Sequence, residues 1–298
     1  MINLRYHVVS LVGVFLALAI GIAVGASVIN QGLVQQQQAR LARIERNLDG
    51  RDRTINNLRG KLASSDSLYT KAEPLLLAGH LADTSIVLVV PQGVDKTAVS
   101  ELRDRFEAAG ADLLAEIWLS PRMAVSTAAD QQAVDAALGI STGSPATARY
   151  LMFQALRSAL RKAGPFSTLQ SLKEARLLDI RNQRVVAAPI GADARIVVVS
   201  QPGSDVPEAD VLLPVVTLLA ADDPTRVVVS ELTATTPGLV DRIRSTATLA
   251  DKVSTVDHVD TAAGRVAVVL AVEDLSVGVV GNYGTATGAS GLLPTAAP

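Results

Sequence analysis

The sequence predicts an α/β fold: an N-terminal transmembrane helix, a coiled-coil helix, and then a Rossmann-like parallel sheet domain with helices on both faces. Three observations support this prediction. Residues 8–29 contain no charged side chain, residues 33–72 repeat apolar side chains at heptad spacing, and residues 80–277 alternate short β-branched runs with helical patterns. Strands that alternate with helices through short loops are typical of a parallel sheet.

The uncharged segment at residues 8–29 is long enough to cross a membrane. Its 22 residues extend about 33 Å as a helix, which matches a bilayer hydrocarbon core of about 30 Å. A cleaved signal peptide is one alternative, but its apolar core spans only about 7–15 residues. A buried helix of a soluble domain is another, but such helices seldom lack charge on every face. We therefore expect a transmembrane helix.

Small residues recur at every fourth position of this segment, at Gly13, Ala17, Gly21 and Gly25. Residues four apart share one face of a helix, and small side chains there let a second helix approach closely. The spacing predicts a packing face inside the membrane, although glycine is common in membrane helices for other reasons as well.

The charges that flank the segment give a weak signal of orientation. The leader, residues 1–7, carries Arg5 and the terminal amine, whereas Arg40, Arg43 and Arg46 follow ten uncharged residues on the other side. The more basic flank normally faces the cytoplasm, and here the flanks differ little. Because so short a leader is easily left inside, we expect a cytoplasmic N-terminus and an extracytoplasmic bulk of the chain.

The heptad pattern at residues 33–72 predicts a coiled coil of modest strength. Gln37 and Arg51 at d positions weaken the seam, and two glycines in the segment cost about 1 kcal/mol each relative to alanine. A parallel homodimer is expected; the alternative is an amphipathic helix that docks on the chain's own domain. The seam residues at positions a and d are Val34, Leu41, Ile44, Leu48, Ile55, Leu58 and Leu62.

Beyond Pro74, which is expected to lie at or near the end of the helix, five runs predict buried strands of a parallel sheet. These are residues 84–90, 111–119, 194–200, 226–231 and 265–272, with a short extended stretch at 253–259. Asp95 is the expected N-cap of the first helix between them, Tyr150 lies on the expected inner face of the third, and Pro214 is expected to kink the fifth. The helical patterns are residues 95–109, 128–138, 147–163, 168–178, 209–220 and 239–247.

The C-terminal residues 278–298 are rich in glycine and threonine. Residues 281–288 are expected either to fold as a tight loop whose backbone amides hold an anion, or to belong to a flexible tail.

No recognisable catalytic or cofactor motif is present. The turn after the first predicted strand is PQGVD, which matches neither GxGxxG nor GxxxxGK[ST], and no GxSxG motif occurs. His258 between Asp257 and Asp260 is the one combination of metal-binding type, and it is more typical of a surface cluster than of a metal site. We expect no enzymatic activity, no catalytic residues, no cofactor and no resident metal.

The composition also argues against several kinds of binding protein and binding site. A net charge of −2 argues against nucleic-acid binding, and the lack of cysteine excludes disulfides and thiolate ligands. Copper prefers thiolate, thioether or imidazole ligands, but neither the three methionines nor the three histidines lie at ligand spacing. A single transmembrane helix also cannot enclose a conduction path by itself.

Two blocks at the ends of the chain are distinctive. The first is the opening MINLRYHVVSLVGVFLALAIGIAVG, and the second comprises Ser254-Thr-Val-Asp257, Gly264-Arg265, Asp274-Leu275, Gly281-x-Tyr283-Gly-Thr285 and Gly288-Ala289. In order and spacing they resemble the actinobacterial MctB/SteB family over nearly the whole chain, with residues 120–190 the least similar part.

The resemblance implies two functions. MctB-like proteins are named as copper transport proteins of the mycobacterial envelope, proposed to form channels. SteB-like proteins are linked to cell division, pair with the membrane protein SteA and influence a peptidoglycan hydrolase outside the cytoplasm. An anchor, a coil and a domain without a reactive site suit the second function better. We therefore expect a non-enzymatic scaffold or regulator of cell division and of a peptidoglycan hydrolase, with a SteA-like partner; copper export is the alternative.

Overall fold

The computed structural model describes residues 4–160, 166–181, 194–221, 223, 226–233 and 236–294. The chain forms two compact units, Met1–Ser65 and Asp66–Pro298, and each is described by itself. The domain boundaries expected from the sequence stay predictions.

A single helix, α1 (Leu4–Leu77), runs through both the predicted transmembrane segment and the predicted coil segment. Its continuity follows from the sequence, because no proline precedes Pro74 and most side chains in the segment favour helix. Pro74 lies in the last turn of α1, as predicted. A proline there removes a backbone donor, so the helix ends soon after it.

The rest of the described chain is built around a seven-stranded sheet with strand order β3-β2-β1-β4-β5-β6-β7. All neighbouring strands are parallel except β2 and β3, which are antiparallel. The order of the parallel strands is that of a doubly wound sheet, so the predicted fold class is confirmed. The strands are β1 (Ser85–Pro91), β2 (Asp112–Leu119), β3 (Leu178–Arg181), β4 (Arg195–Ser200), β5 (Val227–Glu231), β6 (Ser254–Val256) and β7 (Asn282–Tyr283).

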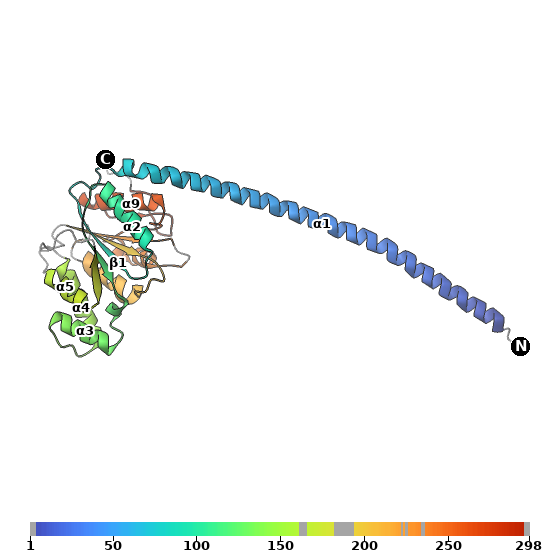
Figure 1. The fold of residues 1–298 in the computed structure, drawn as a ribbon, viewed down its shortest axis with the longest axis horizontal. Helices are drawn as coiled ribbons and strands as arrows, with labels where there is room; N and C mark the ends of the chain where they lie inside the picture. The colour runs from blue at the N-terminus through green and yellow to red at the C-terminus, as the bar shows by residue number, and fades with distance from the viewer. Residues whose placement is uncertain are drawn as a thin grey trace. The chain divides into compact units, whose positions relative to one another are not determined.

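Helices cover both faces of this sheet (Figure 1). Alternate residues of β1 point to opposite faces: Leu88 packs with α2 (Lys96–Ala108) and α9 (Ala262–Ser276), whereas Val87 packs with the helices of the other face. That second layer contains α3 (Ala128–Leu138), α4 (Pro145–Ala159), α5 (Phe166–Glu174), α6 (Leu213–Ala220), α7 (Leu239–Arg244) and α8 (Ala247–Ala250). The central strands are buried on both faces, as their continuous apolar runs predict.

Local signals account for several elements. The Asp95 carboxylate accepts a hydrogen bond from the Thr97 amide at 2.9 Å and caps α2, as predicted. Gly110, at φ 88°, follows the end of that helix. Helix α3 spans the predicted residues 128–138, with Thr127 as its N-cap and Gly139 in the left-handed conformation at its end.

The prediction of a strand at residues 265–272 is wrong, because this run lies inside helix α9. The Thr261 side chain caps the helix by accepting from the Gly264 amide at 3.1 Å. Helix α9 is buried on most sides, so its sequence shows no polar stripe, and composition alone does not separate such a helix from a buried strand. The helix also packs closely on the preceding loop, since a Cβ at Gly264 would collide with the His258 carbonyl oxygen.

The segment around β3 differs from the prediction of a helix at residues 168–178. Helix α5 ends at Glu174, Arg176 adopts φ 58°, and the chain then forms β3 against β2. Tyr150 was expected on the inner face of α4 but is 57% exposed; the buried side chains of that helix include Met152 and Phe153. The predicted end of this helix at residue 163 lies outside the described residues.

The remaining helical predictions are confirmed in outline. The predicted helix at 209–220 consists of a π-helical turn, Glu208–Leu212, followed by α6, and the change occurs beside Pro214, where a kink was expected. The helix predicted at 239–247 is divided into α7 and α8.

Candidate functional site

The N-terminal part of α1 forms a candidate membrane anchor. Within the described residues, Arg5–Gly25 is the one helical segment long and apolar enough to cross a membrane: it has 21 residues, a mean hydropathy of 2.6, and none of it is buried within the chain. At 1.5 Å per residue this length matches a bilayer core of about 30 Å. An apolar surface of this size needs a non-aqueous environment, which indicates membrane anchoring.

The predicted packing face lies open along this segment. A Cβ atom added at Gly13, Gly21 or Gly25 would meet no other atom within 4 Å, and Ala17 is exposed. The structure therefore leaves the face free of contacts within the chain, and its use for helix packing stays a prediction.

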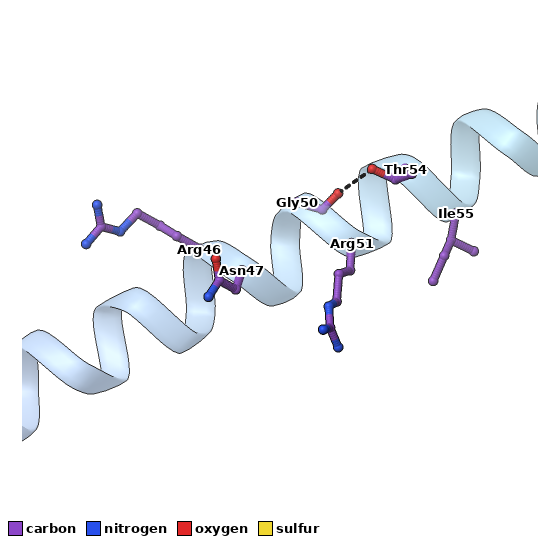
Figure 2. Close-up of a pocket in the computed structure, with 6 residues that line it drawn as sticks. All are labelled: Arg46, Asn47, Gly50, Arg51, Thr54 and Ile55. Carbon is purple, nitrogen blue, oxygen red and sulfur yellow. Dashed lines mark hydrogen bonds between the residues drawn. The ribbon is translucent and has the colours of Figure 1, made fainter.

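The predicted seam of the coil segment is exposed as well. Its described side chains, Leu41, Ile44, Leu48, Ile55, Leu58 and Leu62, are 44–64% exposed. The side chain of Val34 lies outside the described residues. Figure 2 shows Arg51 and Ile55 directed to the same side of α1, while Arg46 is directed elsewhere. Arg51 thus lies in line with an apolar seam residue, as its d position predicts.

The hollow in Figure 2 belongs to the surface of this one helix. Its lining residues all come from α1, and the Thr54 hydroxyl donates to the Gly50 carbonyl at 2.9 Å. The hollow forms where Gly50 lacks a side chain. It has no opposing wall, so it does not have the concave form of a small-molecule site.

The place where doubly wound sheets bind nucleotides is closed here. That place is the crevice at the carboxyl ends of β1 and β4, where the strand order reverses. The Asp205 amide donates to the Gln92 carbonyl at 2.9 Å, and the Asp95 amide donates to the Gln201 side chain at 2.9 Å. Gly93, at φ 93°, lies so close that a Cβ there would be 2.5 Å from the Asp205 nitrogen. The two loops therefore fill the crevice with their own contacts.

Two buried carboxylates lie at the neighbouring strand end. Glu231 accepts from the Ser200 hydroxyl at 3.2 Å and from the Val240 amide at 3.1 Å, and Glu208 lies 3.9 Å from Arg242. Burial raises the pKa of both carboxyls, and their mutual repulsion adds to the rise for Glu231. The partners of Glu231 are an amide and a hydroxyl of its own scaffold, so Glu231 links the ends of β4 and β5 to the start of α7.

The Gly-rich C-terminal segment, described up to residue 294, holds an internal anion. The amides of Thr285 and Ala286 donate to the Asp257 carboxylate at 2.8 and 3.1 Å. Arg244, which is almost fully buried, donates to the same carboxylate at 2.8 Å and to the Tyr283 carbonyl at 2.7 Å. The predicted tight loop is therefore present over its described residues, and the anion its amides hold is a side chain of the chain itself.

These contacts favour the ionised form of Asp257, and they bear on whether His258, Asp257 and Asp260 could form a metal site. Burial alone would raise the pKa of Asp257, but hydrogen bonds from Thr285, His258, Arg244 and Ala286 outweigh it and hold the pKa below its usual value. Asp260 instead accepts from the Thr233 amide and hydroxyl, both at 2.7 Å. Asp257 and Asp260, the two carboxylates close to His258 in the sequence, therefore accept hydrogen bonds from different loops.

Copper ligands are not brought together in the part of the chain that the structure describes. No group of three or more His, Cys, Asp or Glu side chains able to hold a metal occurs there. Met123 and Met152 are fully buried in the apolar core, and His80 pairs with Glu273 at 2.8 Å. These residues do not fit a copper-binding centre.

Comparison with known proteins shows to which family the chain belongs. The family model described as "Copper transport outer membrane protein, MctB" matches residues 1–294. The curated proteins named Copper transporter MctB from Mycobacterium tuberculosis and Mycobacterium bovis are 30% identical to this chain, over 97% of this chain and 98% of theirs. The chain belongs to the MctB family.

Membership in the MctB family confirms the resemblance seen in the terminal blocks of the sequence. The match covers the anchor, the coil segment and the sheet domain together. The relatives carry a copper transport name, so the comparisons favour the copper alternative over the cell-division function that the sequence was expected to serve.

Sequence reasoning missed the buried arginine that organises the C-terminal loop. Arg244 binds Thr255, Asp257 and Tyr283 together, although these residues are separated by up to 39 positions from it. The available signal was the pair of terminal blocks that contain Asp257 and Tyr283, which mark the loop without revealing its partner.

Proposed function

We propose that this chain is a single-pass, non-enzymatic envelope protein that supports copper export. The observation that carries the proposal is its relationship to Copper transporter MctB, at 30% identity over 97% of the chain. The apolar helix supports an anchor in the cell membrane, with the N-terminus in the cytoplasm and the sheet domain outside.

The chain contributes to export through assembly and does not conduct copper alone. One membrane-spanning helix has no second wall to enclose a path, and the described residues gather no copper ligands. The exposed seam of the coil segment supports a parallel homodimer. The open face of Gly13, Ala17, Gly21 and Gly25 supports contact with a further membrane helix. Copper is thus the cargo of the complex.

Deletion of the gene tests this proposal. The deletion strain is expected to lose growth at copper concentrations that the parent tolerates, and the full chain is expected to restore it. A version whose first 29 residues are replaced by a cleavable signal peptide should fail to restore growth, because the sheet domain is then released. Zinc tolerance serves as the control and should not change. Unchanged copper tolerance in the deletion strain would overturn the proposal.

A second candidate function is the scaffold of cell division, with a SteA-like membrane protein and a peptidoglycan hydrolase as partners. The closed crevice between β1 and β4 supports it, because the usual nucleotide-binding place of such a sheet is filled by the domain's own loops. The same deletion strain separates the two. Misplaced or incomplete septa with normal copper tolerance would favour the scaffold, whereas copper sensitivity with normal septa favours export.

A further inference from the structure

An apolar groove lies at the C-terminal end of α1. It has a volume of about 440 Å³, and its polar groups are already paired: His80 binds Glu273 at 2.8 Å, and Asp274 accepts from the Tyr283 hydroxyl at 2.9 Å. An occupant therefore needs an apolar surface and no compensating charge. The apolar lining residues are Leu76, Leu77, Val266, Leu270, Val277, Leu293 and Pro294.

The last turns of α1 are apolar on two different faces. One face is fully buried on the sheet domain: Leu77 has no exposed surface, and Glu73 forms buried ion pairs with Arg105 and Arg265. The other face is open to solvent, although its side chains are large and apolar. Leu68, Tyr69, Leu75 and Leu76 are 69%, 53%, 84% and 57% exposed.

The open face continues the register of the predicted seam. Counting in sevens from Leu62 reaches Tyr69 and Leu76, so both fall at a positions. Leu68 and Leu75 fall at g positions, which hold polar or charged residues from Arg40 to Lys61. The large apolar side chains therefore shift from positions a and d to positions a and g where the helix reaches the groove, because the d positions there are Ser65 and Ala72.

We infer that the groove and the open face of residues 68–76 are docking surfaces for a second copy of this chain. The inference rests on the proposed homodimer and extends it from the coil segment onto the sheet domain. In a parallel pair, identical residues meet at the same height, so the partner's helix end lies beside Leu76 and the groove next to it. Such a contact is self-complementary, as two-fold dimers require.

The area agrees with this occupant. The described apolar seam and helix-end side chains are each more than two-fifths exposed. If each contributes roughly 100 Å², they supply on the order of 1,000 Å² per chain, and a standard interface needs about 800 Å² per partner. By the same estimate the six described coil-segment side chains supply about 600 Å², which is short of that area, so the helix end and groove carry the pair into the stable range.

Single cysteines test the inference directly, because the chain has none of its own. In the full-length protein, purified in detergent, Leu48→Cys reports the coil segment and Leu76→Cys reports the helix end. Lys71→Cys, on an exposed c position, is the matched control. Under mild oxidation, Leu48→Cys and Leu76→Cys are each expected to form disulfide-linked dimers about tenfold faster than Lys71→Cys, since a positions face each other in a parallel pair.

The outcomes distinguish the contact at the groove from the coiled-coil homodimer on which it rests. Cross-linking at residue 48 with only control-level cross-linking at 76 overturns the groove and leaves the coil. Control-level cross-linking at both positions overturns the groove together with the homodimer on which it rests.

A second pair of variants keeps the test independent of cysteine chemistry. Val277→Lys places a charge at the groove, and Leu292→Lys places one at an equally exposed residue outside its lining; the two native side chains are 65% and 68% exposed. In sedimentation equilibrium of the full chain, the dimer dissociation constant should be about tenfold higher for Val277→Lys, a difference of about 1.4 kcal/mol. The constant should be unchanged for Leu292→Lys. Equal dissociation constants for the two variants would contradict the inference.

Discussion

The coil segment (residues 33–72) and the sheet domain (the described residues from 80 on) differ in how far they bury apolar side chains of the same kinds. In the sheet domain, Leu88, Val198 and Phe106 are almost completely enclosed by other parts of the chain. In the coil segment, Leu48 and Leu62 have the same chemistry but are more than half exposed. The sheet domain encloses these side chains within one chain, whereas the seam of the coil segment stays exposed, as expected of a surface that a second copy covers.

Charged side chains also differ in burial between the two regions. Glu73, at the end of α1, is fully buried with Arg105 and Arg265, and Arg244 is buried with Asp257. Charged residues of the coil segment, among them Arg51, remain exposed. Buried pairs fix one arrangement of the elements around them, because breaking such a pair leaves an uncompensated charge. Within the unit Asp66–Pro298, the last turns of α1 are therefore held against the sheet domain at Glu73.

The largest effect is expected for Glu73→Ala. It leaves two arginines facing a buried position without their shared partner, which should lower the free energy of unfolding by about 3–5 kcal/mol. Trp118, the only tryptophan, is buried in the sheet domain and reports its unfolding by fluorescence in urea. Glu45→Ala, in the exposed coil segment, is the control and should change this value by less than about 0.5 kcal/mol. Equal effects of the two variants would refute the buried-pair account.

Leu102→Ala should come next. Leu102 is fully buried between α2 and the sheet, so truncation removes contacts and leaves a cavity, at a cost of about 2–5 kcal/mol. Leu48→Ala makes the same chemical change in the coil segment, where the side chain is 53% exposed. The Trp118 transition should shift for Leu102→Ala and stay in place for Leu48→Ala. A shift of similar size for Leu48→Ala would show that the coil segment supports the sheet domain.

A smaller effect is expected from pH. Burial raises the pKa of Glu231 in the folded state, so this group binds its proton more tightly when the chain is folded. Stability from this group is therefore present below the unfolded pKa near 4.5 and is lost as the pH rises through the folded pKa. Glu231→Gln keeps an acceptor for the Val240 amide and should reduce the loss of stability as the pH rises above the unfolded pKa near 4.5.

Unfolding curves at several pH values check this. Glu107→Gln, which alters an exposed carboxylate, should follow the pH dependence of the unaltered chain. If Glu231→Gln also follows it, the pKa of Glu231 does not control the slope.

The smallest effect on the sheet domain is expected for the pair Gly21→Leu and Gly25→Leu. Both positions are open, so larger side chains meet no atom of the chain and the Trp118 transition should not move. The same change fills the small-residue face and should weaken co-purification of a membrane partner. Ile22→Leu, on another side of the helix, is the control. Unchanged co-purification would show that this face is not used for packing.

The sequence predicted those parts of the molecule that depend on local spacing. The strands near residues 84–90 and 111–119 and the helix at 128–138 have clear runs, caps and terminating glycines, so they appear where expected. The anchor and the seam also depend only on spacing along one helix. Residues 265–272 were assigned to a strand because a fully buried helix rich in valine has no distinguishing period.

The rest depends on residues distant in the sequence. The crevice is closed by Gln92 and Asp205, and the groove joins Leu76 to Leu293. No local pattern specifies these contacts, because they follow from the order of strands in the sheet. The antiparallel strand β3 was missed for a similar reason: four residues after a left-handed Arg176 become a strand only by pairing with β2.

The molar mass of the full-length chain in detergent tests most directly whether the coil segment requires a second copy. Sedimentation equilibrium, with the detergent density-matched, should give twice the 31.0 kDa of one chain. The double variant Leu48→Lys and Ile55→Lys, which places charges on the seam, should give the mass of a single chain with an unchanged Trp118 transition. A monomeric unaltered chain, or a variant that stays dimeric, would contradict the account.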